Sequence, residues 1–257
     1  MNVFAVLLQK ECSSLWKSKK IIWLPIVFML LCAMQPITLY FMDDILKIGG
    51  SLPEGAIIQM PTPTAGEVMV GVLSQLNTMG VLLVIVTVMG AISDERKNGS
   101  LTMVLIRPVS TLQIVASKMV ANGLLLIFSF FCGYLLSYYY TTVLFESLPV
   151  SLLIESFLLY SLYIMFIVSC VILSSSIFNS NGAIAIINAI FFTLLSLAGG
   201  WFQEQLQWSP TQLSYYASDL VSGREIQNGL WGSVILTCLL ILVIQFLSAK
   251  ILSNKKI

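Results

Sequence analysis

Histidine is absent from this 257-residue sequence, and charged residues make up only 10% of it. Without histidine the chain cannot form a Ser-His-Asp triad or an HExxH metal site, or use imidazole for acid/base catalysis. It also lacks a GxxxxGK[ST] loop, and with it the P-loop route to ATP binding. Any energy taken from a nucleotide must therefore come from another polypeptide. We assign no catalytic residues and no metal ligands.

The shortage of charge also bears on the class of protein. A soluble domain carries about 25% charged residues, whereas this chain is 58% hydrophobic and has too little polar material to cover a globule in water. The five cysteines are scattered without a C-x-x-C pair, so we expect them to serve as small buried apolar residues. This composition fits a lipid environment. The sequence shows no feature that indicates nucleic-acid binding.

Long apolar runs define the predicted fold. A bilayer core about 30 Å thick needs about 20 helical residues, and six runs meet that length. They lie at about 21–42, 72–93, 119–145, 152–177, 183–203 and 230–249. The helix of the second run is expected to begin earlier, near Thr64. The sequence therefore predicts an all-α integral membrane protein, with one domain over residues 21–257.

The distribution of lysine and arginine fixes the predicted orientation. Eleven of the thirteen basic residues lie at the two chain ends or between the second and third runs, and only Lys47 and Arg224 lie on the other side. Short loops rich in basic residues stay in the cytoplasm. We therefore expect both termini to be cytoplasmic, in a multi-pass protein of a bacterial cell membrane.

Residues 1–20 form a segment of their own. Phe4, Leu8 and Leu15 recur at helical spacing, opposite Lys10 and Lys17. Such an amphipathic helix lies in the membrane surface rather than across it. The sequence predicts an N-terminal helix on the cytoplasmic face.

The polar bridge between the second and third runs predicts a helix, a break and a second short helix. Gly99 can end the helix that leaves the membrane, and Ser100 can cap a new one. Arg107 stops it, because a residue before proline disfavours helix. Further along, Ser110 and Gln113 have capping-box spacing and start the next helix. The short helix has an apolar face that two turns cannot bury alone, formed by Leu101, Val104 and Leu105.

Four motifs follow one another across this bridge: Glu95-Arg96, Gly99-Ser100-Leu101, Arg107-Pro108-Val109-Ser110 and Lys118. In this order and spacing they resemble the first cytoplasmic loop of type-2 ATP-binding-cassette (ABC-2) exporter permeases. The N-terminal amphipathic helix, the six runs and a short helix before the last run match as well. The resemblance thus covers essentially the whole chain. It departs at Ser100, where the family usually has threonine, and serine keeps the capping oxygen.

The resemblance implies roles for these residues. The loop would hold a coupling helix that docks on a separate cytoplasmic ABC ATPase, which binds ATP-Mg while this chain binds no cofactor itself. Glu95 and Arg96 would end the second span and contact the ATPase. The apolar face would fill the ATPase groove, and Arg107 would anchor the helix exit. A second permease copy or a sister permease would complete the pathway.

A short amphipathic helix is predicted over residues 208–223. Ser209 is the expected cap, Pro210 suits the first turn, and Gln212 would complete a capping box. The apolar face comprises Leu213, Tyr216, Ala217 and Leu220. It can lie on the outer surface as an interfacial cap, or dip back into the membrane near the transport exit, as the resemblance implies.

Ionisable residues are nearly absent from the centres of the six runs, which disfavours ion relays. Polar exceptions such as Asn122, Asn188 and the run Ser174–Ser176 are expected to form interhelical hydrogen bonds rather than to bind substrate. We therefore expect a permease that exports an amphipathic or apolar compound, such as a peptide, an antibiotic or a lipid-like molecule. The alternatives are an ATP-independent channel or carrier, and a non-transporting adaptor or immunity protein.

Overall fold

The computed structural model describes residues 3–42, 63–100, 109–202, 205–224 and 229–254. Every regular element in these ranges is helical, and six segments there are long and apolar enough to cross a membrane. They are Lys20–Tyr40, Ala65–Lys97, Thr111–Leu144, Val150–Ile177, Asn181–Trp201 and Leu230–Asn254. The predicted all-α membrane fold with six spans is confirmed.

Two spans begin several residues before their apolar runs, because side chains cap them. Thr64 accepts a hydrogen bond from the backbone N of Glu67 and donates its own backbone N–H to the Glu67 carboxylate, at 3.3 and 2.8 Å. The backbone N of Gln113 likewise donates to Ser110 Oγ at 3.3 Å. Both helices thus extend beyond the length that lipid alone requires.

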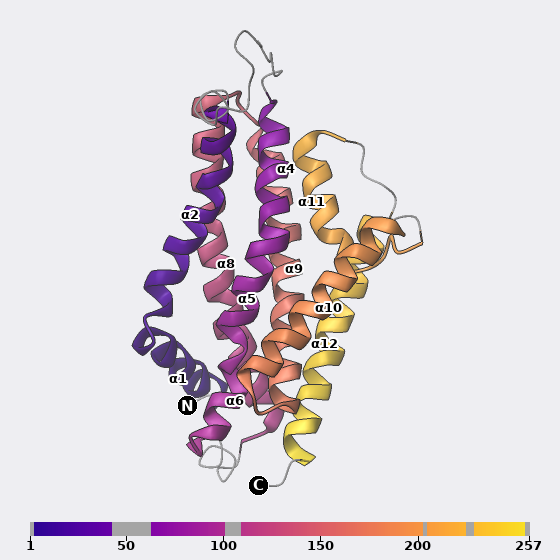
Figure 1. The fold of residues 1–257 in the computed structure, drawn as a ribbon. Helices are drawn as coiled ribbons and strands as arrows, with labels where there is room; N and C mark the ends of the chain where they lie inside the picture. Colours follow the sequence, from indigo (N-terminus) through magenta and orange to yellow (C-terminus); the bar gives the residue numbers. More distant parts are fainter. Residues whose placement is uncertain (1–2, 43–62, 101–108, 203–204, 225–228, 255–257) are drawn as a thin grey trace.

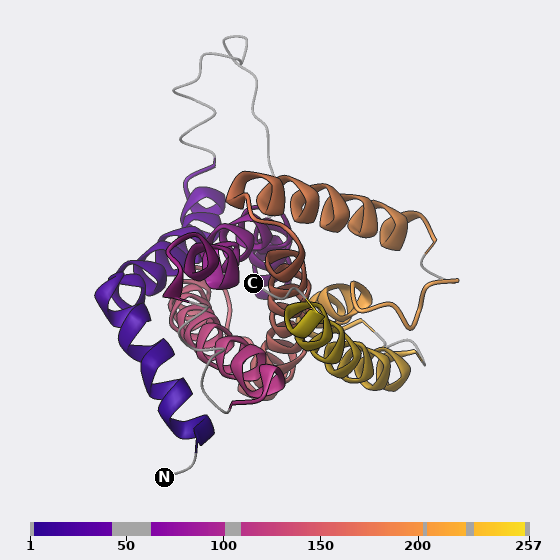
Figure 2. The ribbon, with the colours of Figure 1, turned by 90° about the horizontal axis from the view of Figure 1, so that it is seen from below.

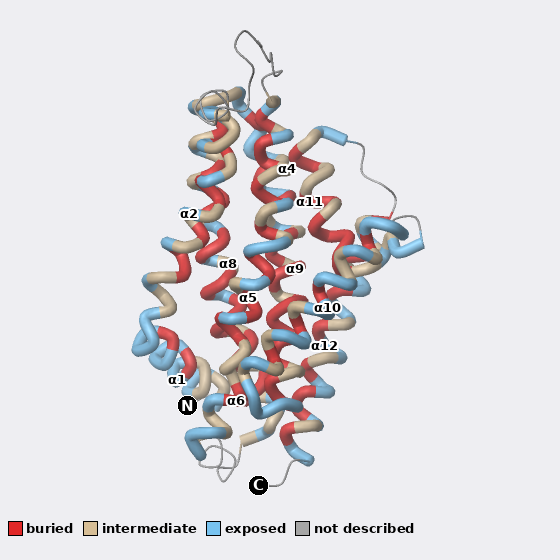
Figure 3. Tube along the Cα trace, viewed as in Figure 1, coloured by how far each residue is buried: buried red, intermediate tan, exposed pale blue. Residues whose placement is uncertain are grey.

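The centre of the bundle consists of α8 (Thr111–Leu144) and α9 (Val150–Ile177), with α2 (Lys20–Tyr40) packed on α8. The two chain ends lie at the same end of the bundle, here called the terminal end (Figure 1). Figure 3 shows buried residues on the inward faces of these helices and exposed ones outside. Exposed apolar side chains include Leu30 of α2, as expected where a helix faces lipid.

The second span is built from four helical pieces. They are α4 (Ala65–Gln75), the π-helical turn η1 (Leu76–Gly80), α5 (Val81–Val88) and α6 (Gly90–Lys97). Helical π turns are rare and often mark functional sites. The joint at Met89 separates α5 from α6 near the terminal end (Figure 1).

The peripheral spans are α10 (Asn181–Trp201) and α12 (Leu230–Asn254). Seen from the terminal end in Figure 2, α10 extends across the view and is therefore inclined to the central helices. Large apolar side chains on both helices are exposed, among them Ile186 at 62% and Phe246 at 70%. These faces are available to lipid or to another membrane protein.

Helix α1 (Val3–Lys17) lies along one edge of the bundle at the terminal end and packs on α8 (Figure 2). A left-handed turn at Lys19, with φ of +57°, separates it from α2. Its buried residues are Leu15 and the acidic Glu11. Two of the cysteines, Cys12 on α1 and Cys238 on α12, are exposed, contrary to the expectation that all five are buried.

Helix α11 (Gln212–Ser222) stands beside α4 and α9, rather than lying flat over them (Figure 1). Its apolar face is buried, with Leu213, Tyr216, Ala217 and Leu220 each at most 6% exposed. The expected cap is wrong. The helix begins after Thr211, and the Gln212 side chain donates to Gly199 O of α10 at 3.0 Å instead of closing a capping box.

Candidate functional site

The end of α6 is where the sequence places the docking loop. The break predicted at Gly99 is present: this glycine has a φ of +70°, a left-handed conformation that favours glycine. Ser100 Oγ donates to Glu95 O at 3.3 Å and so closes the end of the helix. The expected docking residues Leu101, Val104, Leu105 and Arg107 lie outside the described residues. Their roles remain predictions.

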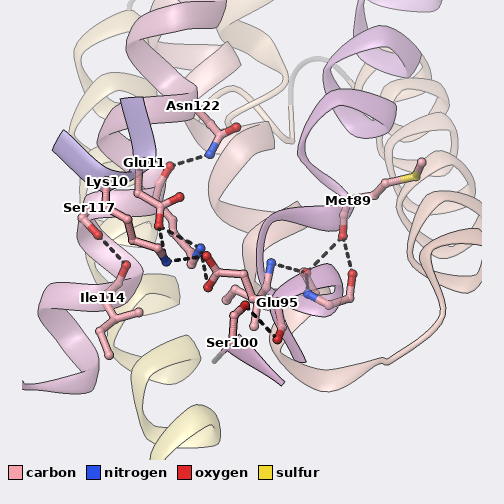
Figure 4. Close-up of polar contacts among 12 residues, drawn as sticks. Lys10, Glu11, Met89, Glu95, Ser100, Ile114, Ser117 and Asn122 are labelled. Carbon is pink, nitrogen blue, oxygen red and sulfur yellow. Dashed lines mark hydrogen bonds and ion pairs between the residues drawn. The ribbon is translucent and has the colours of Figure 1, made fainter. Parts of the chain in front are cut away.

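Four charged side chains from three helices meet at the base of this loop, and we call them the ion-pair cluster: Lys10, Glu11, Glu95 and Lys118 (Figure 4). Lys118 Nζ lies 2.8 Å from Glu95 and 3.0 Å from Glu11. Lys10 Nζ lies 2.5 Å from Glu95 and 3.3 Å from Glu11. Two acids and two bases balance, so the cluster is neutral as a whole. It ties α1 and α8 to the end of α6.

The cluster also sets the protonation of its most accessible member. Burial opposes the charge of Lys10, but the Glu95 carboxylate, assisted by Glu11, outweighs it and raises the pKa of Lys10 above its ordinary value. A raised lysine pKa contributes stability that is complete at neutral pH. That contribution is lost only as the pH rises through the raised pKa.

On its other side, α6 is held by the turn between α9 and α10. Arg96 donates to Asn179 Oδ1 at 2.5 Å and to Ser176 O at 2.8 Å. Asn181 Nδ2 donates to Asp94 Oδ1 at 2.7 Å. Glu95 and Arg96 thus have partners within the chain. Their observed role is to fix the end of the second span, while the ATPase contacts expected of them remain a prediction.

The joint at Met89 is spanned by one side chain of α9. Ser175 Oγ accepts hydrogen bonds from the backbone N of Ile92 and of Ser93, at 3.1 and 3.0 Å, and donates to Met89 O at 3.0 Å. Figure 4 shows the Met89 carbonyl with these contacts. An interhelical role was predicted for this serine run. The same prediction of an interhelical hydrogen bond is wrong for Asn122, because its side-chain amide donates to Lys118 O within α8.

We expect Ser175→Ala to lower the stability of the folded protein by about 1–3 kcal/mol, because two buried N–H groups lose their acceptor. Ser176→Ala is the matched control. Ser176 is equally buried, but its hydroxyl donates only within α9, to Leu173 O. Denaturant titration of the purified protein in detergent measures both. Equal stability of the two variants would contradict a bridging role for Ser175.

Sequence reasoning missed several members of this site. Lys10 was assigned only to a polar helix face, and Glu11 was given no role. The signal in the sequence was a pair of charged residues on a helix next to the membrane. Lys10 pairs with Glu95, 85 positions away, and Glu11 pairs with Lys118, 107 positions away, so neighbouring residues do not reveal these contacts. The turn residues Asn179 and Asn181 were missed because short polar turns between spans are common.

Most of this chain is similar in sequence to known membrane proteins. The family model described as "ABC-2 family transporter protein" matches residues 5–212. The chain is also 37% identical, over 96% of both sequences, to the uncharacterised transmembrane protein YxlG of Bacillus subtilis (strain 168). The resemblance found in the loop motifs is thereby confirmed. This chain belongs to the ABC-2 family of transporter proteins and is a multi-pass membrane permease.

Proposed function

We propose that this permease is the membrane subunit of an ABC exporter and that a separate cytoplasmic ATPase docks on the loop after Ser100. In this proposal the terminal end faces the cytoplasm. The single observation that supports it best is the fixation of α6 from two sides, by the ion-pair cluster and by Arg96. A loop that begins on such a fixed base can transmit a push from a partner into the second span.

The mechanism follows from this connection. Closure of two ATPase subunits around ATP would press on the loops of two permease copies, or of one copy and a sister permease. Because α4, η1, α5 and α6 follow one another in a single span, the displacement would pass along the second span to the opposite end. Alternation between two packed arrangements of rigid helices is a recurrent way to couple distant sites. The cargo is proposed to be an amphipathic or apolar compound.

The docking step is tested with Leu101→Asp combined with Leu105→Asp. Two charges on the apolar face should cost the contact more than about 2 kcal/mol, and therefore reduce ATPase binding more than about 30-fold. Co-purification of the tagged permease with a co-expressed ABC ATPase that has no membrane spans of its own measures the effect. The control is Leu112→Asp, at an exposed position just beyond the loop.

A photo-crosslinker at Val104 gives an independent measurement. It should capture the ATPase in membranes when both subunits are present. If it captures only lipid or the permease itself, and the double variant still binds the ATPase, the docking proposal is wrong. Substrate movement that persists without ATP would instead favour an autonomous channel or carrier.

A further inference from the structure

A polar cavity of about 480 Å³ lies between the second span, α10 and α11. This is within the usual range for small-molecule sites. Hydroxyl and amide side chains contribute much of its lining: Ser74, Asn77, Thr78, Ser196, Gln212, Ser218 and Ser222. We call this space the polar chamber. It lies where α11 stands beside α4, at the end of the bundle opposite the chain termini (Figure 1).

A second space of about 270 Å³ adjoins it between α5 and α10. The two share three lining residues, Asn77, Thr78 and Ser196. The remaining lining of the second space is mainly apolar, with Val81, Leu82, Ala189, Phe192 and Leu197 alongside Thr193. We call it the apolar chamber. The two adjoining spaces therefore differ in polarity along the second span, and η1 lies at the change.

Polar groups at this change lack partners in the part of the chain that the structure describes. Tyr160 donates to Asn77 Oδ1, but the Asn77 amide nitrogen donates to no described residue, and neither the Ser74 nor the Ser196 hydroxyl has a hydrogen bond. Ser74 is exposed, and Asn77 and Ser196 are partly exposed, so these groups are open to water or to a ligand with hydrogen-bonding groups.

Two charged residues line the polar chamber, Asp219 and Arg224, and Asp219 is the less exposed, at 30%. Burial raises the pKa of the Asp219 carboxyl, and Arg224 acts in the opposite direction. The Arg224 guanidinium lies 3.9 Å away, but its side chain is 78% exposed and therefore well solvated. The carboxylate thus lacks a close, buried counter-cation among the described residues. Two tyrosines, Tyr215 and Tyr216, line the same chamber, and aromatic rings attract cations.

We propose that this two-chamber cavity binds the cargo, an amphipathic molecule whose ammonium head occupies the polar chamber against Asp219 and whose apolar tail occupies the apolar chamber. The inference rests on the proposed transport function and narrows its substrate class to cationic amphipaths. The hydroxyl and amide groups would orient the head. The apolar chamber would select against molecules that are polar throughout.

The test uses Ser218→Cys as a reporter inside the polar chamber, in protein reconstituted in lipid nanodiscs. The exposed Cys12 and Cys238 are replaced by serine, and the parent without the reporter gives the background. Cationic and anionic methanethiosulfonate reagents of similar size are compared. The cationic reagent should react about tenfold faster, because one nearby carboxylate attracts it and repels the other. Decyltrimethylammonium should protect the reporter, and decyl sulfate should not.

Asp219→Asn should abolish both the cation preference and the protection, and Asp219→Glu should restore them. Glu155→Gln removes a carboxylate from α9 outside the cavity, and this control should change neither. The proposal is overturned if the two reagents react equally, since the cavity is then a water-filled vestibule only. It is also overturned if both amphipaths protect alike, since binding then does not depend on the charge of the head group. The assay contains no ATPase. If decyltrimethylammonium still protects the reporter while the docking tests fail, the ammonium site is supported and only the proposal of ATP-driven transport is wrong.

Discussion

Lys118→Met is expected to destabilise the protein by about 3 kcal/mol, because it leaves the buried Glu11 and the partly buried Glu95 with one cation between them. The Lys118 side chain is 2% exposed and contacts both Glu11 and Glu95. Methionine keeps much of the volume and removes only the charge, so the loss reports electrostatics rather than a cavity. Denaturant titration of the purified protein measures it. The same substitution at Lys250, an exposed lysine on α12, should have little effect.

A double variant separates this explanation from a general loss of packing. Lys118→Met with Glu95→Gln leaves one acid and one base, Glu11 and Lys10, which lie 3.3 Å apart. We expect this neutral arrangement to regain at least about 1 kcal/mol over Lys118→Met alone. If Glu95→Gln lowers the stability further instead, the four charges of the ion-pair cluster do not act as one electrostatic unit.

Gly133→Val is expected to cost about 3 kcal/mol, because α2 and α8 touch through backbone at this glycine. A Cβ atom added to Gly133 would lie 2.7 Å from Phe28 O and 2.8 Å from Phe28 C. Backbone atoms cannot turn aside as a long side chain can, so the helices must separate. Small residues at helix contacts in membranes permit such close approach.

The matched control is Gly182→Val on α10. The nearest atom to an added Cβ there is Ser180 Oγ at 3.9 Å, which is an ordinary contact. We expect Gly133→Val to unfold at a lower denaturant concentration than Gly182→Val, and to lose contact between α2 and α8. Cross-linking between cysteines placed on these two helices measures the contact. An unchanged cross-linking yield would show that the packing adapts.

Some features of this protein are decided locally, and these the sequence predicts well. Length and apolarity identify the six spans, since a helix in lipid must satisfy its own backbone over about 20 residues. Gly99 ends α6 because its left-handed conformation costs glycine nothing. The Thr64 cap depends on Glu67, three positions away, so it too can be read from neighbouring residues.

Other features depend on which helices become neighbours. Ser209 is a residue type that commonly caps helices, yet α11 starts later. The Gln212 side chain donates a hydrogen bond to Gly199 O of α10 and so does not complete the capping box. The ion-pair cluster likewise forms only where α1, α6 and α8 meet.

The sequence by itself determined the membrane class, the number of spans, the loop motifs of the family and the break at Gly99, because each rests on the chemistry of residues close together in the chain. Only the tertiary structure decided how α6 is held, that α11 stands among the spans, and that Asn77 and Asp219 line one cavity. Apolar helix faces can pack in many ways, and hydropathy does not distinguish among them. Shape and a few polar contacts between distant residues make that choice.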